Sequence, residues 1–233
     1  MPNPDMTARA GAMRGRKLAV AQRPAAAAEE LFDRLVHDLR NPLGVIAYFA
    51  EAVPTAAAAE RDELCERLRV NAQRALHVLE EFCLLADLRH RRSRPLPQTW
   101  DVTELIEEVA GEIESMERRP GQIHRRITVR TPLCLPRPHV ACALRALLRE
   151  AVRATAPDLG LDLAVDAEGA QVVFRLTAPL RRDDELGIVA RLPTTGIEVE
   201  IAQRVAALYG GRCTVEQRPD GDVITLALPA SST

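Results

Sequence analysis

The 233-residue chain lacks the features that would assign it to a membrane or nucleic-acid-binding class. No apolar run approaches the roughly 20 residues that a membrane-spanning helix needs. The arginines near the N-terminus are not followed by the long apolar core of a signal peptide. A net charge of −2 gives no basic excess of the kind that nucleic-acid-binding domains carry. These absences predict a soluble, cytoplasmic protein with neither membrane nor nucleic-acid partners.

Metal-ligand motifs and aromatic residues are scarce as well. The cysteines show neither CxxC nor another metal-ligand spacing, and most lie in apolar sequence, so we expect small core residues and no metal site. Aromatic residues make up 3% of the chain, against 47% hydrophobic residues, which favours a helix-rich core of small side chains. The cysteines are Cys65, Cys83, Cys134, Cys142 and Cys213.

A histidine motif lies inside a long helical pattern that runs from about residue 25 to Val53. Imidazole titrates near neutrality, so one ring nitrogen can be a nucleophile while the other keeps its proton. The next residue, Asp38, can accept a hydrogen bond from that second nitrogen and fix the tautomer. Asn41 follows one helical turn later on the same face, where its amide can orient a water or a partner's carboxylate. The motif reads His37-Asp38-Leu39-Arg40-Asn41-Pro42-Leu43.

The predicted helix places His37 away from its apolar stripe. His37 is two residues from both Leu35 and Leu39, and therefore about 200° around the helix from each at 3.6 residues per turn. An ordinary surface histidine would lie there too. The acid, the asparagine and the proline at their offsets favour a reactive histidine instead. The stripe consists of Leu31, Leu35, Leu39, Leu43, Ile46, Ala50 and Val53.

A second long helix is predicted from about Ala57 to Arg89, with its own apolar stripe. Two antiparallel helices joined by a short turn bury two stripes poorly alone, and docking against a second copy completes a four-helix bundle. We therefore predict a homodimer; the alternative is a hairpin that packs on the rest of its own chain. His77 has no acidic residue next to it and is expected to be structural, whereas Glu80 and Glu81 are expected on a solvated face.

A basic segment with two prolines, His90–Pro97, predicts a linker, and helical and strand-like patterns alternate after it. That alternation predicts an α+β sandwich with antiparallel strands. The first 24 residues have no periodicity and are expected to be a flexible tail. Helices are predicted from Asp101 or Thr103 to Met116, at Pro138–Ala154 and at Ile197–Tyr209, and strands at Ile127–Arg130, Leu161–Val165, Val172–Thr177, Cys213–Gln217 and Val223–Leu228.

The motif around His37 resembles the H-box of two-component histidine kinases, in which the histidine carries a phosphoryl group. Gly196–Gly211 is similar to the last glycine box of these kinases and the helix after it, and Gly221–Pro229 is similar to their final strand. The resemblance implies a dimerisation and phosphotransfer domain at residues 25–90 and a kinase-like ATP-binding domain at 98–230. The implied fold class is α+β: a helical hairpin that forms a dimeric four-helix bundle, then an α/β sandwich resembling a histidine kinase ATPase domain.

The second domain departs from this family at residues that hold ATP. Ala146 and Glu150 stand where the family has asparagines, one of which supplies a magnesium ligand. Ala178 stands where the family has an Asp-x-Gly-x-Gly box, and neither its carboxylate nor its glycines are present.

The last glycine box is altered too. Gly196 is retained, but Glu198 replaces the next glycine and puts a negative charge where polyphosphate would lie. The mobile lid of the family is shortened here to Arg181–Pro193. We therefore expect a degenerate nucleotide site and no cofactor bound by this chain.

The resemblance and these departures imply a histidine phosphotransferase of a phosphorelay. His37 would pass phosphoryl groups between the aspartates of receiver domains, with Asp38 orienting its ring. The receiver partner would supply Mg²⁺. Arg34 and Arg40, beside His37, are expected to attract the acidic receiver site.

Two alternatives stay open. One is an active histidine kinase with unusual nucleotide boxes, which predicts ATP binding and autophosphorylation. The other is a pseudokinase that regulates a kinase or a receiver, or assists dephosphorylation, since Asp38 and Asn41 have the spacing that positions a hydrolytic water in the family. This second alternative predicts that the loss of His37 leaves the regulatory effect intact.

Overall fold

The structure is a computed structural model that describes residues 32–33, 35–90, 95–130, 132–179, 181–183, 188–192, 194 and 196–230. The chain divides into two compact units between Val78 and Leu79, a point inside helix α2 (Ala58–His90). The predicted tail, residues 1–24, and the middle of the predicted linker, residues 91–94, lie outside the described residues. None of the described helices is both long and apolar enough to cross a membrane.

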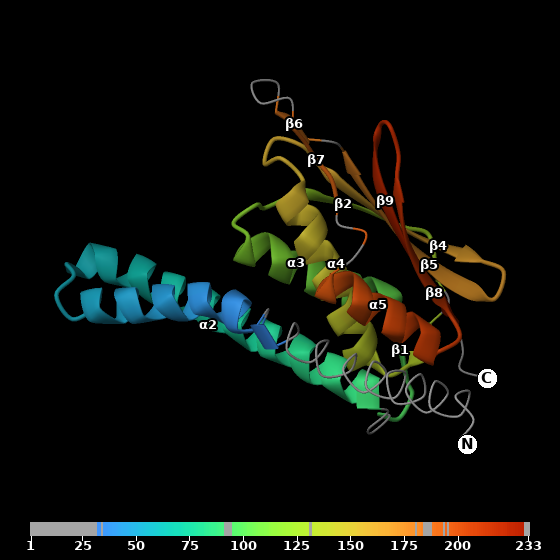
Figure 1. Cartoon of the computed structure of the whole chain (residues 1–233), viewed down its shortest axis with the longest axis horizontal. Coiled ribbons are helices and arrows are strands. Elements are labelled where there is room, and N and C mark those ends of the chain that lie inside the picture. The colour runs from blue at the N-terminus through green and yellow to red at the C-terminus, as the bar shows by residue number, and fades with distance from the viewer. Residues whose placement is uncertain are drawn as a thin grey trace, which may run out of the picture. The chain divides into compact units, whose positions relative to one another are not determined.

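The first unit is a hairpin of two helices (Figure 1). The first helix is continuous over residues 35–52, and α2 begins after a short turn. The guanidinium of Arg67 lies over the ring of Phe49, 5.4 Å from its centroid, so the two helices contact each other. The prediction of Ala57–Arg89 for the second helix is correct to within one residue at each end.

The apolar stripes of this hairpin are only partly covered. Of the stripe residues, Ala75 is buried and Leu39 is half-buried, whereas Leu43 and Leu76 are exposed. This agrees with the prediction that one chain buries the two stripes poorly. The homodimer that would cover them stays a prediction.

The second unit contains the rest of the helices and all of the strands that the structure describes. Three helices alternate with strands in the chain. The helices are α3 (Val102–Met116), α4 (Arg137–Ala154) and α5 (Ile197–Leu208); the strands are β1 (Gln98–Trp100), β2 (Ile123–Ile127), β3 (Leu133–Leu135), β4 (Leu161–Glu168), β5 (Gln171–Pro179), β6 (Arg181–Asp183), β7 (Ile188–Ala190), β8 (Arg212–Gln217) and β9 (Gly221–Pro229).

A five-stranded sheet in the order β2-β4-β5-β9-β8 forms one layer of this unit. Helices α3, α4 and α5 form the other layer, on one face of the sheet (Figure 1). Apolar side chains from both layers, among them Ile106, Leu144 and Phe174, are fully buried. The predicted α+β sandwich is confirmed. It arises because each helix buries one apolar face against the sheet and needs no other partner layer.

The prediction of the first sheet strand was wrong in place and direction. The strand lies at Ile123–Ile127, not at Ile127–Arg130, and it pairs with β4 in parallel. The sequence of this strand does not show the alternation of apolar and polar residues that is typical of a strand. The reason is that a charged residue, Arg125, occupies a half-buried position, where it donates to Glu114 at 2.6 Å. Strands β1, β3, β6 and β7 were not predicted, since three residues are too few to show a period.

Asp101, and not Thr103, caps the start of α3. Its carboxylate accepts hydrogen bonds from the backbone amides of Thr103 and Glu104, at 2.6 and 3.2 Å. These bonds, that of Glu104 first, lower the pKa of the Asp101 carboxyl. They satisfy two of the amides that a helix N-terminus leaves without partners in the helix.

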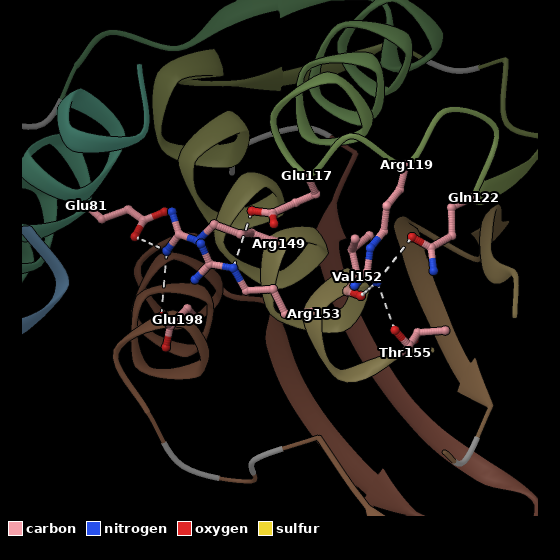
Figure 2. Close-up of polar contacts among 9 residues, drawn as sticks. All are labelled: Glu81, Glu117, Arg119, Gln122, Arg149, Val152, Arg153, Thr155 and Glu198. Atoms are coloured by element: carbon pink, nitrogen blue, oxygen red, sulfur yellow. Dashed lines mark hydrogen bonds and ion pairs between the residues drawn. The ribbon is translucent and has the colours of Figure 1, made fainter. Parts of the chain in front are cut away.

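The C-terminal end of α4 is held by a side chain from outside the helix. The Arg119 guanidinium donates to the carbonyls of Val152 and Thr155, at 2.6 and 2.9 Å (Figure 2). Gln122 donates to the Ala156 carbonyl just beyond, at 3.0 Å. A cation is favourable at this negative end of the helix dipole, so these residues fix the loop that leads from α4 into β4.

The cysteines are less buried than predicted. Only Cys142 and Cys213 are buried, whereas Cys65 and Cys83 are exposed on α2 and Cys134 is intermediate. The apolar neighbours of Cys65 and Cys83 in sequence belong to the α2 stripe, and the two cysteines lie outside it. Burial raises the pKa of the Cys142 and Cys213 thiols to about 12, so both stay neutral at physiological pH.

Gly211, before β8, offers a test of the packing of the sheet edge. A Cβ added there would lie 2.1 Å from the Ala227 carbonyl oxygen of β9. Because backbone cannot yield easily, we expect Gly211→Ala to lower the free energy of unfolding by about 1–3 kcal/mol or more. Gly111→Ala is the control, because a Cβ there meets no atom within 4 Å and alanine favours helix α3 by roughly 1 kcal/mol. Urea denaturation measures both; an equal effect of the two changes would contradict the packing.

Candidate functional site

His37 is exposed on the first helix and is held by its neighbour in sequence. Its side chain is 85% exposed, and Nδ1 lies 3.1 Å from Oδ1 of Asp38. A carboxylate can only accept, so this contact places the proton on Nδ1 and leaves the Nε2 lone pair free to attack. The structure therefore brings His37 and Asp38 together as the sequence predicted.

The helix face that bears His37 forms one side of an open groove of about 500 Å³. Its polar end carries Arg40 and Asn41 and its other end is apolar and aromatic. Asn41 lies at i+4 from His37 and is exposed, as expected. Arg40 is exposed beside it, whereas Arg34 lies outside the described residues. The groove is lined by His37, Arg40, Asn41, Gly44, Val45, Tyr48 and Phe49.

This groove combines a nucleophile, a positive charge and an apolar surface. The exposed nitrogen of His37 can reach an electrophile on another molecule, and Arg40 attracts an anionic one. Tyr48 and Phe49, with ring centroids 5.4 Å apart in an edge-to-face arrangement, give an apolar surface at the other end of the groove. The arrangement suits group transfer to and from a macromolecule.

The positions that matched a nucleotide site lie in the second unit, and most are buried. Ala146 on α4 is fully buried and Ala178 on β5 nearly so. Glu150 is partly buried on α4, and Gly196 directly precedes α5. Glu198 is 5% exposed, so its charge faces protein and not solvent.

The partner of Glu198 is Arg149, which sequence reasoning missed. One guanidinium nitrogen of Arg149 donates to Oε2 of Glu81 at 2.6 Å and lies 3.6 Å from Oε1 of Glu198 (Figure 2). All three side chains are less than 8% exposed. Burial acts to lower the pKa of Arg149, but attraction by Glu81 and then by Glu198 raises it overall. We call these three residues the charge triad.

The triad overturns the expectation that Glu81 lies on a solvated face. Glu81 is 3% exposed, while its neighbour Glu80 is exposed as expected. A signal for the triad was present in the sequence: Arg149 lies between the apolar residues Leu148 and Val152 on α4, and an arginine buried among them needs a carboxylate partner. Nothing in the sequence names that partner. His77, expected to be structural, is buried, and its Nε2 lies 3.0 Å from the Gln73 amide nitrogen.

A second buried carboxylate, Asp222, holds the end of the predicted lid. It pairs in register with Ala178, where the kinase pattern has its adenine-binding carboxylate. Both of its oxygens are used, since the Leu192 amide donates to one at 2.6 Å and Arg191 donates to the other at 2.9 Å. Asp222 therefore fastens the segment after β7 to the sheet. Sequence reasoning missed this residue as well.

Comparison with known proteins assigns the histidine segment. Residues 27–91, which include His37 and all of α2, match the family described as the His Kinase A (phospho-acceptor) domain. The chain carries a phospho-acceptor domain of the histidine kinase type. The match covers the motif that drew attention in the sequence, together with the whole helical hairpin. No curated protein matches the chain in sequence.

Solved structures extend the likeness beyond the phospho-acceptor domain. Histidine kinase AdeS of Acinetobacter baumannii has a TM-score of 0.55 over 83% of this chain and 98% of its own, at 16% identity. Histidine kinase ThkA, in complex with the response regulator protein TrrA, has 0.52 over 91% and 64%, at 18% identity. A bacterial phosphotransferase has 0.50 over 84% and 93%, at 16% identity. The fold is therefore that of a phospho-acceptor domain followed by a kinase-like catalytic domain.

The His37–Asp38 contact predicts the tautomer of the phospho-acceptor domain's histidine. We expect neutral His37 to carry its proton on Nδ1, because the Asp38 carboxylate accepts from that atom. Long-range proton–nitrogen NMR correlations report the tautomer directly. Asp38→Ala should shift His37 toward the Nε2-protonated form, while His124→Ala, on β2, should leave it unchanged. An unchanged tautomer in Asp38→Ala would show that the carboxylate does not control the ring.

Proposed function

We propose that this protein is a cytoplasmic histidine phosphotransferase of a two-component phosphorelay, which carries phosphoryl groups between receiver-domain aspartates on His37. One observation carries the proposal: an exposed His37–Asp38 pair belongs to a chain in which Glu198, paired with the buried Arg149, stands where the kinase pattern has a phosphate-binding glycine. A chain with an acceptor histidine but no nucleotide site must obtain its phosphate from another protein.

The chemistry needs only positioning and charge. Nε2 of His37 attacks the phosphorus of an aspartyl phosphate in line, and a nitrogen–phosphorus bond forms as the bond to the aspartate oxygen breaks. The aspartate leaves as a carboxylate. The aspartate of a second receiver then attacks the phosphohistidine in the same manner. No proton has to leave Nε2, because Asp38 keeps the ring proton on Nδ1.

The receiver completes the site across the interface. Its acidic pocket would bring the Mg²⁺ that neutralises charge on the transferred group, and Arg40 adds a positive charge at the rim of the groove. The solved complex of histidine kinase ThkA with response regulator TrrA supports a receiver as partner. The likeness to a bacterial phosphotransferase agrees in fold with a protein that relays phosphate.

The proposed loss of nucleotide binding follows from the negative charge of Glu198 in the second unit. In the kinase pattern a glycine at position 198 lets the backbone approach phosphate, whereas Glu198 adds a side chain and a carboxylate whose charge repels a polyanion. Arg149 does not offset this repulsion for a ligand, because it already binds Glu81 at 2.6 Å. Asp222 is likewise engaged by Leu192 and Arg191. The chain is proposed to bind no nucleotide cofactor.

A homodimer is the proposed assembly. The hairpin exposes Leu43, Tyr48, Leu76 and other large apolar side chains within one chain. A second hairpin would cover part of this surface and complete a four-helix bundle.

Phosphotransfer from a labelled receiver tests the proposal. A phosphorylated receiver should label the wild-type chain, and His37→Ala should abolish the label. His124→Ala removes another exposed histidine and is the matched control, with unchanged labelling expected. Asp38→Ala should slow transfer by about 100-fold, since a positioned proton acceptor contributes roughly that factor or more. Label retained in His37→Ala would exclude His37 as the carrier.

The same assay distinguishes the alternatives. If the chain instead assists dephosphorylation, the receiver loses phosphate to water without a labelled intermediate, and Asn41→Ala abolishes that loss while His37→Ala does not. An active kinase would label itself from ATP in the absence of any receiver. A pseudokinase regulator would do neither and would act on a kinase or receiver by binding alone.

A further inference from the structure

The last three turns of α2 are tied to the kinase-like fold of the second unit by ion pairs with two helices. Glu81 binds Arg149 of α4, and Arg149 in turn lies beside Glu198 of α5. At the end of α2, Arg89 donates to both carboxylate oxygens of Glu200 on α5, the nearer at 2.8 Å. All of these residues lie within one compact unit, so their arrangement is internally defined.

These ion pairs differ in burial, and the most buried one contributes most to holding the end of α2 in place. Arg89 and Glu200 keep about a quarter of their side-chain surface, 25% and 29%, and water screens such pairs. The triad keeps 7% or less at each side chain. Water cannot replace a partner there, so removal of one charge leaves the others in a poorly polarisable environment.

Each charged side chain of the triad comes from a different helix, so the triad forms only when all three helices are packed together. Two carboxylates, from α2 and α5, share one guanidinium from α4 (Figure 2). Glu81 and Glu198 would repel each other in a dry site without the cation between them. Arg149 can therefore satisfy both only while the end of α2 is docked against α4 and α5 together. Leu85, fully buried one turn after Glu81, adds an apolar contact on the same helix.

We propose that the charge triad is a conformational clamp that keeps the end of α2, Leu79–His90, permanently docked on α4 and α5 without any ligand. Glu198 occupies the position of a phosphate-binding glycine, so one substitution both removes a ligand contact and supplies the third charge of the clamp. In the wild-type chain the end of α2 therefore opens locally only when the triad breaks. This inference stands independently of the phosphotransferase proposal.

Hydrogen exchange on the full chain tests the clamp. We expect Arg149→Met to accelerate amide exchange in residues 79–90 by at least about 100-fold, because it removes the shared cation from two buried carboxylates. Amides of β5 and β9 should change by less than about 5-fold. Arg153→Met is the matched control on the same helix, since its pair with Glu117 at 3.3 Å is half exposed on the arginine side. It should leave residues 79–90 unchanged.

A rescue variant keeps the test decisive if Arg149→Met unfolds. Glu81→Leu, Arg149→Met and Glu198→Leu together replace the triad by apolar side chains, which often restores or raises the stability lost with a broken buried pair. We expect this triple variant to fold and to restore slow exchange in residues 79–90. Two results would overturn the clamp: slow exchange in residues 79–90 of a folded Arg149→Met, or acceleration of equal size in β5 and β9.

Discussion

Arg149, held between Glu81 and Glu198, is the interaction on which the second unit depends. A buried guanidinium is unfavourable unless carboxylates surround it, and two buried carboxylates are unfavourable unless a cation separates them. The three charges therefore require three helices to keep one arrangement. The apolar core fixes the layers of the sandwich, and the triad fixes where the end of α2 lies on them. One of the three charged residues, Glu198, stands where the kinase pattern has a glycine that lets the backbone approach phosphate.

The two units meet opposite physical demands. The first must leave its reactive atom in water, and it does so by placing His37 on a helix face remote from the apolar stripe, with Asp38 holding the ring. The second has turned polar groups inward and paired them: Asp222 with Leu192 and Arg191, and Arg149 with its two glutamates. The reactive side chain of the first unit is thus exposed, whereas these polar side chains of the second unit bond to one another. The proposed relay function suits that combination, since its phosphate would come from a partner.

The sequence was sufficient for features that depend on local pattern. The long α2, helices α3 to α5 and the His37 motif each have a period or a spacing that survives folding, and Asp101 was one of two expected caps. Features that depend on residues far apart in the chain could not be predicted from the sequence. The parallel pairing of β2 joins segments about 40 residues apart, and Arg125 masks its alternation. Glu81 reads as a surface residue because its partner, Arg149, lies 68 positions away.

The proposed relay function depends most directly on a kinase-like fold that has no place for nucleotide. A calorimetric titration of the full chain with ATP and Mg²⁺, carried to millimolar nucleotide, tests this in one experiment. We predict no saturable heat of binding, because Glu198 repels phosphate and Arg149 is already bound. Saturable binding would contradict this proposal, return ATP as the phosphate source for His37 and make the chain a histidine kinase with altered boxes.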